Sequence, residues 1–175
     1  MRRADPMPHL AAVAKAITLA DQPRATFVAL DRALGAALGH TLFTILIHHE
    51  DTRESERIYT NQPAAYPVGG KKPLRDTAWG RQVIGERRAF IGRTAKDIET
   101  HFPDHALIAS LGCASIVNLP VVWGARLLGT INLLHDEHWY DDADVPIGLL
   151  FAALAVPAYL VAAQPRASAG EGRRA

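Results

Sequence analysis

The strongest constraint on the fold is a pair of long apolar runs that meet at a tight-turn signal. They flank Gly124-Ala125 in the segment 113–135, CASIVNLPVVWGARLLGTINLLH. A two-residue connection that begins with glycine fits a β-hairpin, so we expect these runs to pair as antiparallel strands. A two-residue turn places Val117 opposite Asn132. Asn118 and Asn132 are then expected to face opposite sides of the sheet.

The rest of the chain supplies helices at both ends and further strands between them. Apolar spacing predicts helices over 9–20 and 24–38, and β-branched and aromatic residues predict strands over 41–48, 57–60 and 89–92. A long loop over 61–75 is rich in Pro and Gly; short helices are expected from Asp76 and over 106–111. This order predicts an α+β fold. Its antiparallel sheet has the N- and C-terminal helices packed on one face and short helices and loops over the other.

The last apolar segment has two possible environments. Residues 145–163, VPIGLLFAALAVPAYLVAA, carry no charge and are about long enough to span a bilayer. Alanine dominates the segment, and Pro146, Gly148 and Pro157 interrupt it, so we expect a core helix and no membrane association. Because the segment is apolar on all sides, it also predicts a partner subunit and therefore a homodimer.

Composition narrows the classes of function. The 19 Lys and Arg residues are balanced by 18 Asp and Glu residues, so the net charge is +1, and no basic patch indicates nucleic-acid binding. The single cysteine, Cys113, excludes an internal disulfide and fits a reducing cytoplasm. The start of the chain lacks the apolar core of a signal peptide. We therefore expect a cytoplasmic domain over 8–163, with disordered tails over 1–7 and 164–175.

Three segments together resemble the GAF domain family. SIVNLPVVWGARLLGTINLLH is similar to the family's proline-containing strand, tight turn and leucine-glycine strand. WYDDADVPIGLLFAALAVPAYL is similar to its aromatic and acidic entry into the last helix, and TAWGRQVIGERRAFIG resembles its central helix, glycine and strand. The likeness covers about residues 10–163 and preserves the order of these pieces.

The resemblance implies a PAS-like sheet with a pocket on the face opposite the terminal helices, roofed by the middle of the chain. Family members bind cyclic nucleotides, linear tetrapyrroles, amino-acid-like metabolites or haem, and they commonly dimerise through the terminal helices. Most regulate an attached output domain. The resemblance therefore implies a small organic effector and an unidentified effector protein as partners, and no cofactor can be named.

The candidate ligand-binding residues come from the roofing segment and from one face of the hairpin. That face also carries Leu119 and is chosen because the other carries apolar residues for helix packing; an equal alternative is that Asn132 bonds a loop backbone. The aromatic candidates are equally compatible with a structural role in the core. The candidates are Trp79, Phe90, Phe102, His105, Cys113, Ser115, Val117, Thr130 and Asn132.

Catalysis is not expected. Some GAF proteins reduce methionine sulfoxide with a set of cysteines, whereas Cys113 has no second thiol in the chain to resolve an oxidised sulfur. Cys113 could instead attach a bilin, although a small buried residue is the simpler interpretation. Ser110 and Ser115 lack the glycine-flanked turn of a nucleophilic serine.

Histidines raise a possible metal site. His48 and His49 end one strand, and His135 and His138 lie at the end of another, with Asp136 or Glu137 nearby. Their spacing matches no established ligand pattern, so the sequence assigns no metal. Together with this lack of catalytic or metal-binding patterns, the resemblance to the GAF family implies a non-catalytic sensory domain that binds a small molecule and signals through a partner. The alternative is a dimerisation or recruitment module with an occluded pocket; a redox enzyme is the third possibility.

Overall fold

The computed structural model describes residues 4–74 and 76–164. Within them, six strands form one antiparallel sheet in the order β3-β2-β1-β6-β5-β4. The α+β class and the antiparallel sheet predicted from the sequence are confirmed. The strands are β1 (Leu42–His49), β2 (Glu54–Thr60), β3 (Lys71–Pro73), β4 (Phe90–Gly92), β5 (Ser115–Trp123) and β6 (Arg126–His135).

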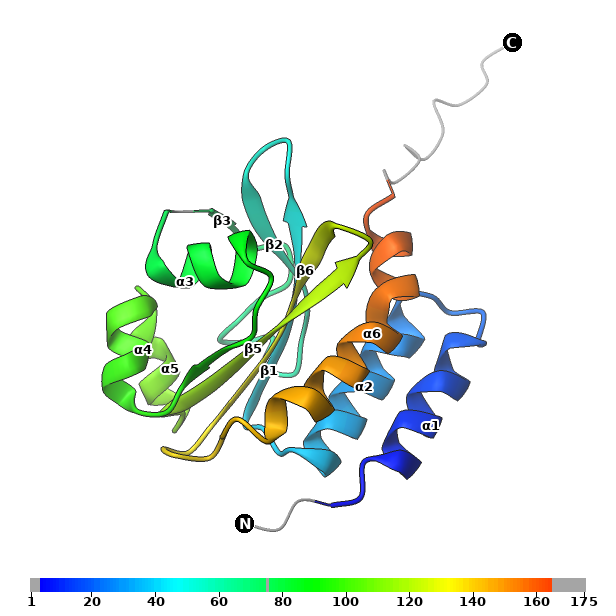
Figure 1. Ribbon diagram of the computed structural model, residues 1–175, viewed down its shortest axis with the longest axis horizontal. Helices are drawn as coiled ribbons and strands as arrows, with labels where there is room; N and C mark the ends of the chain where they lie inside the picture. Colours follow the sequence, from blue (N-terminus) through cyan, green and yellow to red (C-terminus); the bar gives the residue numbers. More distant parts are fainter. Residues whose placement is uncertain (1–3, 75, 165–175) are drawn as a thin grey trace.

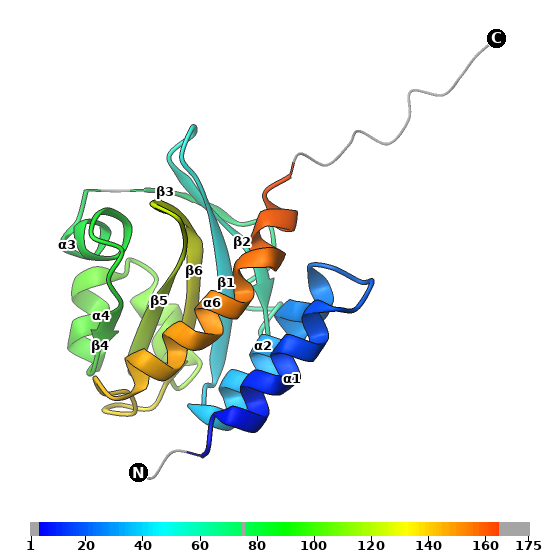
Figure 2. The same ribbon diagram turned by 45° about the vertical axis from the view of Figure 1, so that its right-hand side comes forward.

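The helices lie in separate layers on the two faces of the sheet (Figure 1). The terminal helices cover one face, and the segment between β3 and β5 covers the other; Figure 2 shows the same division from a second angle. The terminal helices are α1 (Met7–Ile17), α2 (Arg24–Ala37) and α6 (Asp144–Ala162). The middle segment forms α3 (Ala78–Gly80), the π-helical turn η1 (Arg81–Gly85), α4 (Ala95–His101) and α5 (His105–Ser110).

The apolar segment at the end of the chain forms α6 and packs on the sheet. By length and composition this helix could cross a membrane. In the structure it lies against β5, and helices α1 and α2 pack beside it. Gly148 permits the close approach, because a Cβ there would lie 2.6 Å from Leu119 Cδ1. One side of α6 therefore packs into the core and the other side is exposed.

Local details differ from the sequence predictions. The loop over 61–75 contains β3, a short strand that pairs with β2 at the sheet edge. Thr77, and not Asp76, caps α3: its hydroxyl accepts the Gly80 N–H at 3.0 Å, while Asp76 pairs with exposed Arg81.

The predicted tails fall largely outside the described residues. Residues 1–3 and 165–175 are not described, and α1 begins at Met7, the last residue of the predicted N-terminal tail. The predicted domain boundaries stay predictions.

Candidate functional site

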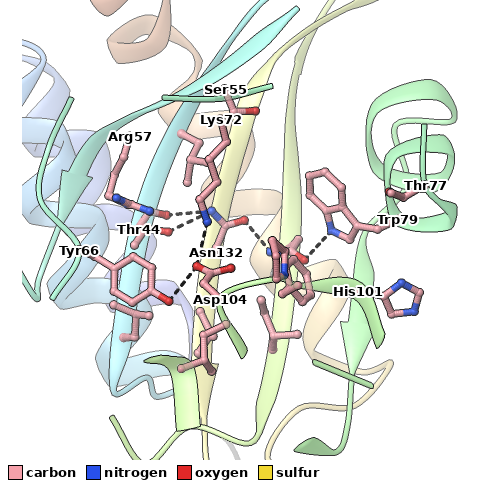
Figure 3. Close-up of a pocket in the computed structure, with 18 of the residues that line it drawn as sticks. Thr44, Ser55, Arg57, Tyr66, Lys72, Thr77, Trp79, His101, Asp104 and Asn132 are labelled. Carbon is pink, nitrogen blue, oxygen red and sulfur yellow. Dashed lines mark hydrogen bonds and ion pairs between the residues drawn. The ribbon is translucent and has the colours of Figure 1, made fainter. Parts of the chain in front are cut away.

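A cavity of about 380 Å³ lies between the sheet and the middle segment, on the face opposite the terminal helices. Its floor is formed by β1, β2, β5 and β6, and its walls by the segment from β3 to α5. Figure 3 shows the polar side chains that line it. Leu42, Leu46, Ile108, Ile116 and Leu134 give it an apolar surface. Volume and lining are typical of a small-molecule site.

A chain of hydrogen bonds crosses the cavity floor. Trp79 Nε1 donates to Asn118 Oδ1 at 2.9 Å, and Asn118 Nδ2 donates to Asn132 Oδ1 at 2.6 Å. Asn132 Nδ2 donates to Thr44 Oγ1 at 3.1 Å. Both asparagines are almost fully buried. Their amides are satisfied by one another, which makes burial of these polar groups tolerable and fixes their orientation.

The prediction that the two asparagines face opposite sides is wrong. The turn pairs Trp123 with Arg126 as expected, but the register then shifts, and Val121 pairs with Gly129. Leu128 is therefore an extra residue in β6, a β-bulge that moves the remaining pairs by one position. Because side chains alternate along a strand, this shift places Asn118 opposite Asn132, on the cavity face.

A second bulge directs a charged residue into the cavity. Leu46 pairs with Arg57 while Ile45 pairs with Tyr59, so Ile58 is the extra residue in β2. Tyr59 consequently faces the terminal helices, where its hydroxyl donates to Asp31 at 2.8 Å. Arg57 faces the cavity instead. A regular strand would have placed both side chains on one face.

Arg57 is held under the loop that follows β2. Its Nη1 donates to the Pro67 carbonyl oxygen at 3.0 Å, and its guanidinium lies 4.6 Å from the centre of the Tyr66 ring. Only 8% of the residue is exposed. Burial lowers the pKa of Arg57, although an arginine this basic keeps its charge.

Beside Arg57, Asp104 forms a small polar cluster with Tyr66 and Lys72. Its Oδ2 accepts hydrogen bonds from Tyr66 at 3.0 Å and from Lys72 at 2.9 Å. Burial alone would raise the pKa of Asp104, but these donors hold it below its ordinary value. The carboxylate is therefore ionised, and it connects α5, β3 and the loop at one end of the cavity.

Solved structures with this fold cover most of the chain. The GAF domain of an Acinetobacter phosphoenolpyruvate-protein phosphotransferase matches with a TM-score of 0.72 at 12% identity, over 90% of this chain and 94% of its own. The corresponding domain from Coxiella burnetii has a TM-score of 0.70 at 16% identity, over 90% and 94%. The fold is that of a GAF domain.

The GAF fold also occurs in an enzyme among the matching structures. Free methionine-R-sulfoxide reductase from Neisseria meningitidis, solved with its substrate, has a TM-score of 0.68 at 13% identity, over 91% of this chain and 93% of its own. No protein-family profile matches the sequence. No curated protein matches it either. The likeness therefore shows a GAF fold and leaves the activity to be argued from the cavity.

The structure brings together part of the predicted binding set. Trp79, Phe102 and Asn132 line the cavity. Thr130 lies on the same face by alternation but does not line the cavity. Phe90 does not line the cavity. It packs against Phe102, with their ring centroids 6.1 Å apart.

Other predicted residues lie away from the cavity. Val117 is on the opposite face, in the core beneath the terminal helices, so the expectation that it faces the cavity is wrong. Ser115 is buried, and its hydroxyl donates to the Asp136 carbonyl oxygen at 2.6 Å. His105 is exposed, and its ring binds the Phe102 carbonyl oxygen. The bulge at Leu128 explains the misplaced Val117, because it reverses which side chains of β5 share a face with Asn132.

Cys113 is buried in an apolar cluster between the sheet and the middle segment. It is 3% exposed and packs with residues such as Phe90 and Ile108. Burial raises the pKa of its thiol to about 11, so the thiol is protonated near neutral pH. A protonated, buried thiol is a poor nucleophile.

The histidine groups form other contacts. His48 Nδ1 lies 2.5 Å from Ser55 Oγ, and His49 binds Glu56 at 2.9 Å. His135 stacks on Trp139, with ring centroids 3.5 Å apart. Among the residues that the structure describes, no group of three or more His, Cys, Asp and Glu side chains could hold a metal ion.

Sequence reasoning missed the charged end of the cavity. Ser55, Arg57, Tyr66, Lys72 and Asp104 all line it. The long loop over 61–75 was a partial signal, because such loops are often functional and this one supplies Tyr66 and Lys72. Nothing in the sequence indicated that Arg57 faces the cavity, because its orientation depends on the bulge at Ile58.

Proposed function

We propose that this chain is a sensory domain that binds a small organic molecule, performs no catalysis and signals through a partner protein. The supporting observation is the cavity of about 380 Å³, whose floor carries ordered amides and whose ends carry charged and aromatic groups. The hydrogen bonds between these amides hold them in fixed positions, and a few fixed polar groups beside an open apolar space are typical of a binding site.

The known uses of the fold support a regulatory role. Matching structures include a domain of a two-component sensor histidine kinase from Bacillus halodurans and the chromophore-binding domain of a bacteriophytochrome from R. palustris. Here Cys113 is buried and protonated, outside the cavity lining, which favours non-covalent binding over thiol chemistry. Together with the single cysteine, the fold fits a cytoplasmic location.

A cavity-filling variant tests ligand binding directly. Leu134 lines the cavity and is 3% exposed, so Leu134→Trp is expected to occupy ligand space. Wild type should show melting shifts with some members of a metabolite library, and this variant should not. Leu19→Trp, at a residue that is 52% exposed and distant from the cavity, is the control. Equal shifts in both variants, or none in wild type, would argue against binding in this cavity.

We also propose a homodimer formed through the terminal helices, which bears on the alternative function as a dimerisation module. The outward side of α6 exposes Leu149, Leu150, Leu160 and Val161. Apolar side chains grouped on one helix favour coverage by another protein surface. Light scattering should give a dimer for wild type and a monomer for Leu150→Glu. A wild-type monomer at high concentration would contradict the dimer and leave the cavity proposal intact.

A further inference from the structure

Arg57 carries a buried charge that has no carboxylate partner among the described residues. One N–H group reaches the Pro67 carbonyl oxygen, and the ring of Tyr66 lies against the guanidinium. Nε is buried and has no hydrogen-bond partner in the described part of the chain. These direct contacts are neutral. Burial lowers the pKa of Arg57 and the charge of Asp104 opposes that shift, but Asp104 makes no direct ion pair with Arg57 among the described residues, so the position favours an anion that comes from outside the chain.

The neighbouring acid does not meet this need. Asp104 is bound to Lys72 and Tyr66. Among the described residues at this end of the cavity, Lys72 and Arg57 supply two positive charges and Asp104 supplies one negative charge, which leaves a net positive charge. A singly charged anion would balance it. A dianion such as a phosphate ester would instead leave an excess negative charge at this end of the cavity, beside Asp104.

The shape of the remaining cavity defines the rest of the ligand. Figure 3 shows Arg57 and Tyr66 at one end and Trp79 at the other, with Lys72, Asp104 and Asn132 between them. The surfaces of Leu46, Ile116 and Leu134 lie along the floor. An apolar body fits this surface, because burying it removes apolar area from water.

We propose that the cavity takes a small monocarboxylic acid whose carboxylate pairs with Arg57 and whose apolar body extends along the sheet toward Trp79. The planar guanidinium suits a carboxylate because its N–H groups match both oxygens. This inference rests on the proposed function, since it names the ligand class of the same cavity.

Matched acids and amides test the inference. The probes are benzoate, phenylacetate, cinnamate and hexanoate, each paired with its primary amide, and binding is followed by protein-detected NMR titration. The amide keeps the shape of the acid and removes its charge. At least one acid should bind wild type about tenfold or more tightly than its amide.

The variants assign that preference to one side chain. Arg57→Gln should lower the affinity for the acid about tenfold or more and leave amide binding nearly unchanged. Arg126→Gln, the same change at an exposed residue of the hairpin, should preserve both. Arg57→Lys keeps the charge but loses the planar fork, and is expected to bind the acid with intermediate affinity. If Arg57→Gln does not fold, the affinity of Arg57→Lys for the acid, compared with that of wild type, tests the role of the guanidinium.

The outcomes separate the two proposals. Binding of acids and amides with equal affinity, or undiminished acid binding by Arg57→Gln, would overturn the carboxylate assignment while the cavity remains a binding site. If neither acids nor amides shift resonances of cavity residues while members of the metabolite library still raise the melting temperature of wild type, the carboxylate assignment fails and the proposed function stands. If the library causes no shift either, the proposed function itself fails.

Discussion

The two faces of the sheet are built from the same strands, yet their chemistry differs. Against the terminal helices, Phe43, Ile45, Ile131 and Leu133 pack into a continuous apolar core. On the other face, polar side chains of β1, β2, β5 and β6 surround a cavity of about 380 Å³. One face is filled with apolar side chains, and the other keeps space beside hydrogen-bonding groups.

In this small domain, one face of the sheet mainly provides stability and the other provides space for binding. Close packing of apolar side chains stabilises the helix face, and deletions there leave cavities. The cavity face contributes less packing and holds two of the three buried side-chain nitrogens that have no hydrogen-bond partner among the described residues, Arg57 Nε and His48 Nε2; the third, His40 Nδ1, lies beside α2. Functional sites commonly contain such locally unfavourable groups.

The largest expected effect comes from deleting a side chain on the helix face. Phe151 is fully buried between α6 and the sheet. Phe151→Ala should lower the free energy of unfolding by about 3–5 kcal/mol, because the lost apolar contacts leave a void. Phe102→Ala, at the half-buried edge of the cavity, should cost clearly less. Urea denaturation measures both free energies of unfolding. Equal losses for the two variants would contradict the proposed difference in packing between the two faces.

Acid should weaken the cavity face through His48. Burial, followed by the nearby charge of His49, lowers the pKa of His48 from 6.5 to about 4. The unfolded chain therefore binds a proton more readily than the folded chain between these values. The free energy of unfolding should fall by about 3 kcal/mol as the pH decreases through this window.

A variant isolates this histidine from other titrating groups. His48→Gln keeps a hydrogen-bonding side chain beside Ser55 but cannot titrate. The wild-type and variant stabilities should converge as the pH falls from 6.5 to about 4. If the stabilities of wild type and of His48→Gln change with pH in parallel, the protonation of His48 does not contribute to the loss of stability in acid.

The asparagine pair should show strong coupling. Asn132→Leu removes the acceptor of Asn118 Nδ2 and should cost about 1–3 kcal/mol, because a buried donor loses its partner. Replacing both asparagines by Leu should cost less than the sum of the single changes, since no unsatisfied amide remains between them. A double-mutant cycle by chemical denaturation measures the coupling, and additive losses would contradict the register that pairs these residues.

The smallest expected effect concerns Arg57. Without ligand, Arg57→Gln should change the free energy of unfolding by less than about 1 kcal/mol, because loss of the Pro67 contact is offset by removal of a buried charge. Thermal melting beside the control Arg126→Gln measures this. A loss as large as that of Phe151→Ala would assign Arg57 to the structural core.

Much of the fold could be predicted from the sequence. The turn at Gly124-Ala125 and its flanking apolar runs predict the β5–β6 hairpin, and the last apolar segment predicts α6 on the sheet. These features are local, or depend on one long pattern. The same local signals identified Trp79 as a residue of the roof, and it does line the cavity.

The site was less predictable because it depends on two bulges. Leu128 and Ile58 each add one residue to a strand, and neither residue type marks a bulge in a sequence. The first brings Asn118 and Asn132 onto one face, and the second turns Arg57 into the cavity. A one-residue shift reverses the orientation of every later side chain, so the site cannot be read from alternation alone.

A crystal structure of the protein with the tightest-binding acid from the titration would show whether the cavity holds a small molecule. We expect density for that acid within the cavity, with its carboxylate against Arg57 and its apolar body along Leu46 and Leu134. A cavity closed by Trp79 and Phe102 packed onto the sheet, with the acid bound elsewhere, would contradict this expectation.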